Sequence, residues 1–155
     1  MSKLLPPAVR TRLYGDHLDF ETVFRNQPNV EPEIRGRDRR FLDRALKLAQ
    51  TSEHSGWKIG AIIAKGSRTL AVGINSYRNE PHQVAERLWE CSLHAEETAI
   101  RSANLRADPD RLAGSTIYVA RWNQNNPGQR AQPCVRCQAL IDEVGIRRVA
   151  WTNAK

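Results

Sequence analysis

Apolar residues along the chain recur at two different spacings, and these spacings predict the order of helices and strands. Between residues 37 and 54 the apolar positions return every three or four residues with charges between them, which is typical of an amphipathic helix. Two short apolar runs follow at 59–64 and 69–74, joined by the turn-forming KGSR, and they predict a β-hairpin. A long polar loop then leads to a second predicted helix over about 93–105.

The remainder of the chain continues to alternate strand with helix. A strand is predicted at 115–121, a helix from Pro133 to about Val144, and a last strand at 146–151. Strands that alternate with helices favour an α/β fold whose sheet is covered on both faces. We therefore expect a layered α/β architecture.

The length of the chain limits the number of domains. With 155 residues it is long enough for one domain with a hydrophobic core and too short for two of ordinary size. Residues 1–35 carry four prolines and only weak periodicity, so we interpret them as an N-terminal extension of a domain that spans 36–155. No run approaches the ~18 apolar residues of a membrane span, so we expect no membrane partner.

The N-terminus and the cysteines indicate a compartment. MSKLLPPAVR has two prolines where a secretory signal would need an apolar stretch. Three cysteines, two of them in a C-x-x-C, do not make a disulfide framework. We expect a cytoplasmic protein.

The charge balance of the chain favours anionic partners. The net charge is +7, from 24 Lys and Arg against 17 Asp and Glu, and 19 of the cations are arginine. Arginine suits forked recognition of phosphate, but a high arginine content also fits an ordinary solvated surface. Charge alone therefore permits a nucleotide or a nucleic-acid partner without choosing between them.

The motif PCVRC at Pro133–Cys137 places two thiols together. We expect Pro133 at the first position of a helix, where proline is favoured. Cys134 and Cys137 then share a face of the first turn, where exposed amides and the helix dipole favour thiolates. Such a pair is half of a zinc site or, alternatively, a redox dithiol, which the position of the motif near the end of the chain disfavours.

The stretch SLHAEETAI, residues 92–100, supplies the missing groups. One imidazole, from His94, with two thiolates forms a catalytic zinc set that leaves one position open, and Glu96 would move protons there. In a regular helix His94 shares a face with Glu97 instead. We still assign the proton transfer to Glu96 and expect Glu97 on the surface or beside the site.

Five residues match the H-x-E and P-C-x-x-C signature of zinc-dependent base deaminases: His94, Glu96, Pro133, Cys134 and Cys137. Over about residues 37–151 the chain resembles the cytidine and deoxycytidylate deaminase superfamily. The resemblance implies a three-layer α/β/α cytidine deaminase-like fold with a mixed sheet of four or five strands. It also implies hydrolytic deamination, with Zn²⁺ held by His94, Cys134 and Cys137 and with Glu96 as the proton carrier.

The resemblance extends to substrate contacts. It implies that the Ala95 amide binds the base carbonyl and that Asn75, in VGIN, binds the sugar. The segment CQALIDEVGIRRVAW is similar to the deoxycytidylate-type branch, so the best prediction is conversion of dCMP to dUMP and ammonia, by a homo-oligomer acting on a small nucleotide or nucleoside. Contacts to phosphate or base are predicted for six residues: Arg78, Arg87, Trp89, Arg121, Trp122 and Arg130.

Other readings stay open at this point. A polynucleotide base deaminase acting on single-stranded DNA or RNA, or a purine-base deaminase, would use the same chemistry. A structural Cys3His zinc module that includes Cys91 would have no catalytic role. Two features differ from many relatives: the loop 122–132 is long, and the chain stops soon after the fourth strand. We therefore expect either a smaller sheet or an N-terminal extension that covers the exposed sheet edge.

Overall fold

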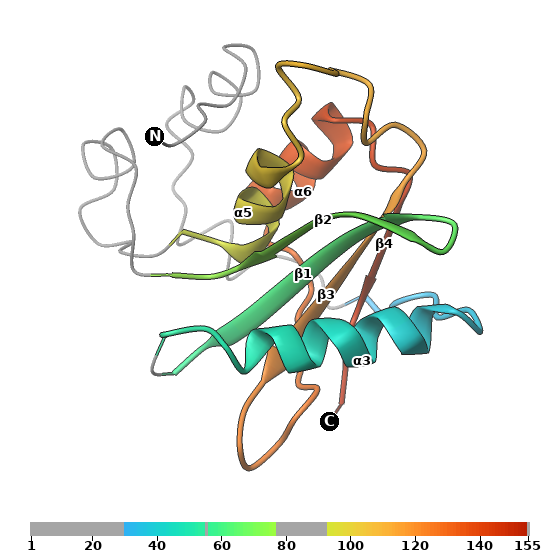
Figure 1. Ribbon diagram of the computed structural model, residues 1–155. Helices are drawn as coiled ribbons and strands as arrows, with labels where there is room; N and C mark the ends of the chain where they lie inside the picture. Colours follow the sequence, from blue (N-terminus) through green and yellow to red (C-terminus); the bar gives the residue numbers. More distant parts are fainter. Residues whose placement is uncertain (1–29, 55, 77–92, 155) are drawn as a thin grey trace.

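The computed structural model describes residues 30–54, 56–76 and 93–154. Every helix and strand predicted in these residues is present, in the predicted order (Figure 1). The elements are α3 (Asp38–Ala49), β1 (Lys58–Lys65), β2 (Arg68–Ile74), α5 (Ala95–Ser102), β3 (Thr116–Trp122), α6 (Val135–Glu143) and β4 (Arg148–Trp151). Within the described ranges no helix is long and apolar enough to span a membrane.

The helices are shorter than predicted. Helix α3 ends at Ala49, not near residue 54. Helix α6 begins at Val135 with Cys134 as its N-cap, so Pro133 precedes the cap and does not occupy the first helical position. Residues 50–54, which follow α3, are all polar, so the predicted continuation of the helix into them was wrong.

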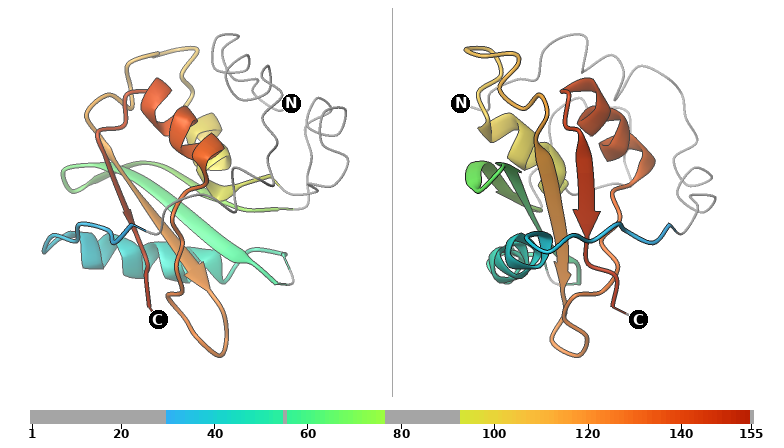
Figure 2. Two further views of the ribbon diagram at one scale, coloured as in Figure 1. Left: turned by 180° about the vertical axis from the view of Figure 1, so that it is seen from behind. Right: turned by 90° about the vertical axis from the view of Figure 1, so that its right-hand side faces the viewer.

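The described strands form one mixed sheet in the order β2-β1-β3-β4. Strand β1 is antiparallel to both β2 and β3, whereas β3 and β4 are parallel. Helix α3 covers one face of the sheet, and α5 and α6 cover the other (Figure 2). The structure thus confirms the three-layer α/β/α architecture.

Strand β1 contributes to the core on both sides. Ile62 packs toward α3 with Phe41 and Tyr118, whose rings stack at 4.7 Å between centroids. Ile63, the next residue, points to the opposite face and packs in the cluster formed with α5 and α6. Full burial of a side chain of this size stabilises the fold by about 1.5–3 kcal/mol. Burial on both faces explains why this strand reads as a continuous apolar run.

Two glycines let helices lie directly on the sheet. A Cβ at Gly60 would overlap the backbone of α3 at Ala45 and Ala49. A Cβ at Gly73 would overlap the backbone of α5 at Ala95 and Ala99. These contacts are made to backbone atoms, which cannot turn aside as a side chain can. The distance from the sheet to each helix is therefore set by the missing methyl group.

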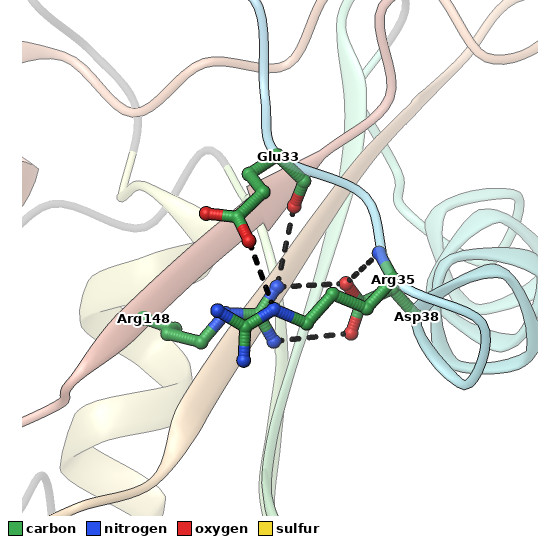
Figure 3. Close-up of polar contacts among 4 residues, drawn as sticks. All are labelled: Glu33, Arg35, Asp38 and Arg148. Atoms are coloured by element: carbon green, nitrogen blue, oxygen red, sulfur yellow. Dashed lines mark hydrogen bonds and ion pairs between the residues drawn. The ribbon is translucent and has the colours of Figure 1, made fainter.

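The described end of the N-terminal extension contacts strand β4 and the residues after it. The Arg148 guanidinium donates to both carboxylate oxygens of Asp38, at 2.8 and 3.3 Å, and to the carbonyl oxygen of Glu33 (Figure 3). Asn153 donates to Glu31 at 2.6 Å. Residues 31–33 therefore lie beside this edge of the sheet, while residues 1–29 lie outside the described part.

Asp38 is a buried carboxylate that ties α3 to β4. Burial raises its pKa, but hydrogen bonds from the Arg148 guanidinium and the Arg35 amide outweigh burial, and the pKa of Asp38 is lowered overall. A carboxyl group with a lowered pKa in the folded state stabilises the fold above its unfolded pKa of about 3.9. This contribution is lost as the pH falls through the folded value.

We predict that Asp38→Asn lowers the free energy of unfolding at pH 7 by about 1.5–3 kcal/mol, the usual range for hydrogen bonds to charged groups. The difference from wild type should shrink as the pH falls from about 4 toward the lowered pKa of native Asp38, because the unfolded chain binds a proton at this residue before the native protein does. Urea unfolding of both proteins between pH 7 and pH 2.5 measures it. A difference that is independent of pH would contradict this role of the ion pair.

Candidate metal centre and active site

His94 lies immediately before helix α5, not inside it. Its backbone is extended, with φ −71° and ψ 149°, and it is the N-cap of the helix. The preceding residue, Leu93, pairs with Ser76 just beyond the end of β2, through two hydrogen bonds of 2.8 and 3.1 Å. This bridge delays the start of α5 to Ala95, two residues later than predicted, and fixes where the imidazole emerges.

Helix α6 begins in a similar way with a cysteine. Cys134 is the extended N-cap, and its Sγ accepts a hydrogen bond of 3.4 Å from the amide of Cys137. Both thiols are buried. The Cys134 sulfur therefore caps the helix in place of the usual side-chain oxygen. The positive end of the helix dipole favours a thiolate at this position.

The three predicted ligands meet in one cluster. The Nδ1 atom of His94 lies 3.3 Å from Cys137 Sγ and 3.7 Å from Cys134 Sγ. All three ligand atoms lie within 4.8 Å of one another. Zn–S bonds of ~2.3 Å and a Zn–N bond of ~2.05 Å at tetrahedral angles require N···S separations of about 3.6 Å. The donor set and its spacing thus fit a zinc ion with three protein ligands.

The two thiols have opposite pKa shifts because they share a hydrogen bond. The bond from the Cys137 thiol lowers the pKa of Cys134 to about 5, with a further lowering by His94. Donation of that bond, together with burial, raises the pKa of Cys137 well above its ordinary value. The shared hydrogen bond therefore favours one thiolate and one thiol in the pair, and binding of a divalent cation would favour loss of the second proton.

Glu96 lies in the first turn of α5 and is only 5% exposed. Burial raises its pKa to about 7, against an opposing effect of the His94 imidazole, and the Cys134 sulfur raises it further. These influences place its carboxyl group in the same electrostatic environment as the ligand cluster. Because His94 is not helical, the periodicity that favoured Glu97 as the partner of His94 does not apply here.

Glu97 is fully buried, so of the two expected places, on the surface or beside the site, it occupies the second. Its carboxylate lies 3.7 Å from the guanidinium of Arg136, which is also buried and comes from the first turn of α6. The ion pair therefore joins the two helices that carry the ligand cluster. Removing one partner of a buried pair commonly costs about 3–5 kcal/mol.

Asn75 lies directly after β2 and is almost fully buried. Its side-chain oxygen accepts hydrogen bonds from Ser52 and from the Ile59 amide, at 2.7 and 2.9 Å, and its amide donates to the carbonyl oxygen of Trp57. Asn75 thus holds the segment before β1 in place and retains one amide N–H for a ligand. Its sugar contact stays a prediction.

The sequence analysis did not identify Trp57, which is 55% exposed. The Arg121 guanidinium, from the end of β3, stacks on its ring at 3.7 Å from the centroid. Burial lowers the pKa of Arg121, and its Nε atom has no hydrogen-bond partner among the described residues. Trp57 lies in the stretch SGWK, immediately before β1. The glycine in this stretch was the only signal in the sequence for an exposed turn.

The other predicted contacts have mixed outcomes. Trp122 lies at the same sheet end, with the Lys58 ammonium 5.7 Å from its ring centroid. Arg130, in the loop 122–132, bonds to the side chain of Gln132. Arg78, Arg87, Trp89 and Cys91 lie outside the described residues.

The loop 122–132 is held by the residues that follow β4. Gln129 forms bridges to Arg121 and to Ala154, and the Ala131 amide donates to Thr152 at 2.9 Å. The returning half of the loop thus extends the sheet irregularly beyond β3 and β4. Pro133 and Cys134 follow directly, so these contacts also position the start of α6.

Comparison with known sequences identifies the same motif region. Residues 35–153 match the family model described as the cytidine and deoxycytidylate deaminase zinc-binding region. An uncharacterized deaminase of the luxG 3′ region of Aliivibrio fischeri is 32% identical over 119 residues, which cover 72% of this chain and 69% of that protein. Deoxycytidylate deaminase of Mycobacterium phage D29 is 28% identical, over 74% of this chain and 92% of its own length. The tRNA-specific adenosine deaminase of Buchnera aphidicola is 29% identical, over 74% and 65% respectively.

Solved structures share the fold. The dCMP deaminase of cyanophage S-TIM5 superimposes with a TM-score of 0.54 at 23% identity, over 72% of this chain and 79% of that chain. Cytidine deaminase of Burkholderia pseudomallei gives a TM-score of 0.50 at 26% identity, over 74% and 84%. The family match, the ligand cluster and the shared fold together lead to one conclusion: this chain belongs to the cytidine and deoxycytidylate deaminase family and is a hydrolytic, zinc-dependent deaminase.

Proposed function

We propose that His94, Cys134 and Cys137 hold the zinc ion, that Glu96 carries the protons, and that the substrate is a free cytosine nucleotide, with dCMP the best candidate. The observation that supports the metal site is the meeting of one imidazole nitrogen and two sulfurs at tetrahedral spacing. A metal held by three protein ligands keeps one position for chemistry, which distinguishes it from a closed structural site.

The reaction needs one water and two proton transfers. Zinc at such a site supplies Lewis-acid chemistry that makes water acidic enough to react at neutral pH. The Glu96 carboxylate accepts a proton from water as the oxygen bonds to C4 of cytosine, and it delivers that proton to the ring nitrogen N3. It then takes the remaining water proton from the new C4 hydroxyl and passes it to the amino group. The C4–N bond breaks as the C4=O bond forms, and ammonia leaves the uracil product. A buried carboxyl group with a pKa of about 7 both accepts and donates readily at neutral pH.

The groups around the cluster support a small substrate. The Ala95 amide is the first of α5 and has no acceptor within the helix, so it is available to a base carbonyl. Arg121, at the same end of the sheet, has a half-buried cationic head whose Nε has no partner among the described residues. Such a group suits one phosphate monoester. The chain also spans nearly all of the phage deoxycytidylate deaminase and about two thirds of the tRNA deaminase.

One observation favours a second candidate, a polynucleotide base deaminase. Trp57 is an exposed aromatic ring backed by a cation, and base stacking on such rings is common in single-strand binding. Lys58 and Trp122, which directly follow Trp57 and Arg121 along the chain, form a second pair of a cation and an aromatic ring. The assay below therefore includes nucleic-acid substrates.

For the metal site, we predict that the purified protein contains about one zinc per chain and that Cys134→Ala and Cys137→Ala each abolish tight binding, because both thiolates coordinate directly. Metal analysis after dialysis against a weak chelator measures this. Cys91→Ala is the matched control and should retain its zinc. Loss of zinc in that variant would instead favour the closed Cys3His site.

For proton transfer, we predict that Glu96→Gln keeps zinc and thermal stability but lowers kcat by about 10²–10⁴-fold, the usual value of general acid–base catalysis. Glu97→Gln is the isosteric control one residue away. It should unfold more easily, because it leaves the buried Arg136 charge without a carboxylate, but the folded enzyme should keep most of its activity. The reverse pattern, with Glu97→Gln inactive and Glu96→Gln active, would refute the assignment.

For the substrate, we predict that dCMP gives the highest kcat/KM in an ammonia-release assay. The panel contains cytosine, cytidine, deoxycytidine, CMP, dCMP, adenosine, guanine, a cytosine-containing single strand and a tRNA anticodon stem-loop. Turnover restricted to either nucleic acid, with a steep fall as salt is added, would establish the second candidate.

Arg121→Gln separates phosphate recognition from the chemical step. The variant should raise KM for dCMP by roughly 10- to 100-fold, the value of one charge-assisted hydrogen bond, and change kcat/KM for deoxycytidine little. Arg68→Gln, at an exposed arginine where β2 begins, serves as the matched control. An equal loss on both substrates would exclude a phosphate contact at Arg121.

A further inference from the structure

A polar pocket lies at the end of the sheet opposite the metal centre. It has a volume of about 410 Å³. The segment before α3, the turn after β1 and the starts of β3 and β4 surround it. The lining residues that matter here are Arg35, Arg37, Gly66, Gly114, Arg147 and Arg148. We call it the arginine pocket.

The arginine pocket has more positive charge than its carboxylates neutralise. Arg35 pairs with Glu33 at 3.0 Å, and Arg148 pairs with Asp38 at 2.8 Å (Figure 3). Among the described residues, no carboxylate lies within ion-pair distance of Arg37 or Arg147. The guanidinium groups of Arg37 and Arg147 therefore line the arginine pocket without a carboxylate partner among the described residues.

Other groups near the pocket also favour an anion. The 12-residue helix α3 begins here; its N-cap residue, Arg37, makes no side-chain capping bond, and the carboxylate in its first turn, Asp38, is already paired with Arg148. The Lys65 ammonium lies beside Gly114 at the rim, donating to the Ala113 carbonyl. Tyr118 and Thr116 complete the lining, and the Tyr118 hydroxyl bonds to Asp38.

Two guanidinium groups without carboxylate partners at one concave site match the needs of a tetrahedral anion with several acceptor oxygens. We propose that the arginine pocket binds the phosphate group of a small ligand, either free polyphosphate or the phosphate chain of a nucleotide. A hollow of this size holds one such group with its neighbouring atoms. It is not a track along which a strand would make successive phosphate contacts.

The proposed ligand would bind at the same time as substrate. The metal cluster lies at the end of the sheet where β1 begins, because Asn75 bonds to Ile59 and Ser76 pairs with the residue before His94. The arginine pocket lies where β1 ends. Eight residues of strand at ~3.3 Å each separate the two ends by about 25 Å.

Isothermal titration calorimetry tests the proposal on the full-length zinc-containing protein. The probes are inorganic phosphate, pyrophosphate, tripolyphosphate, ATP and a 12-residue DNA strand, each at matched ionic strength. We expect saturable 1:1 binding of pyrophosphate and tripolyphosphate. Tighter binding of ATP than of tripolyphosphate identifies a nucleotide, and equal binding identifies free polyphosphate. Absence of saturable binding by every small probe, or binding of the strand alone, overturns the proposal.

Charge reversal locates the binding. The double variant Arg37→Glu and Arg147→Glu should weaken pyrophosphate binding at least 10-fold and leave the deaminase kcat/KM unchanged, since neither residue belongs to the catalytic site. A glutamate at a helix start favours the helix, so the fold should be retained. The control double variant, Arg106→Glu and Arg111→Glu, carries the same charge change on exposed residues between α5 and β3.

Equal weakening in both double variants would show only a general charge effect and would overturn the proposal. Persistence of binding in the first double variant would do the same, because phosphate would then be bound elsewhere, such as at the metal. The single variants Arg37→Ala and Arg147→Ala provide the same comparison without an added negative charge. Each should weaken pyrophosphate binding on its own.

Discussion

The constraint on which the site depends is the meeting of two helix N-termini on one face of the sheet. His94 and Cys134 are the N-caps of α5 and α6, in segments 40 residues apart, and the two helices contact each other. Each helix brings the positive end of its dipole and first-turn amides without intrahelical acceptors. Anionic sulfur and carboxylate groups can therefore be buried there at a lower cost than in an apolar core.

Burial of so many ionisable groups requires compensation within the site. The two thiols share a proton, and the Glu97 carboxylate faces the Arg136 guanidinium between the same two helices. The ion pair thus links the element that supplies the imidazole and Glu96 to the element that supplies both sulfurs. Positioning of the chemistry and stability of the fold are not separate matters in this region.

The sequence predicted the elements well because burial imposes a clear spacing on strands and helices. It predicted helix starts poorly, since the Leu93–Ser76 bridge that delays α5 is a contact between segments distant along the chain. Treating His94 as helical favoured Glu97 as its partner, and the choice of Glu96 then left Glu97 on the surface or beside the site. Only the three-dimensional structure shows that the Glu97 carboxylate pairs with Arg136. The exposure of Trp57 was missed for a similar reason, because its surroundings include Asn75, which follows β2, and Arg121 from β3.

The bare backbone of Gly73 beneath α5 has a consequence for how this enzyme can diversify. In many proteins a helix drifts over its sheet as the side chains between them are exchanged for larger or smaller ones. Here the α5 backbone lies directly on Gly73, so side chains cannot be exchanged gradually between the helix and the sheet. A bulkier residue at position 73 would displace His94 and Glu96 together. New specificity must then evolve in the loops, around Trp57 and in 122–132, while the reacting geometry is inherited unchanged.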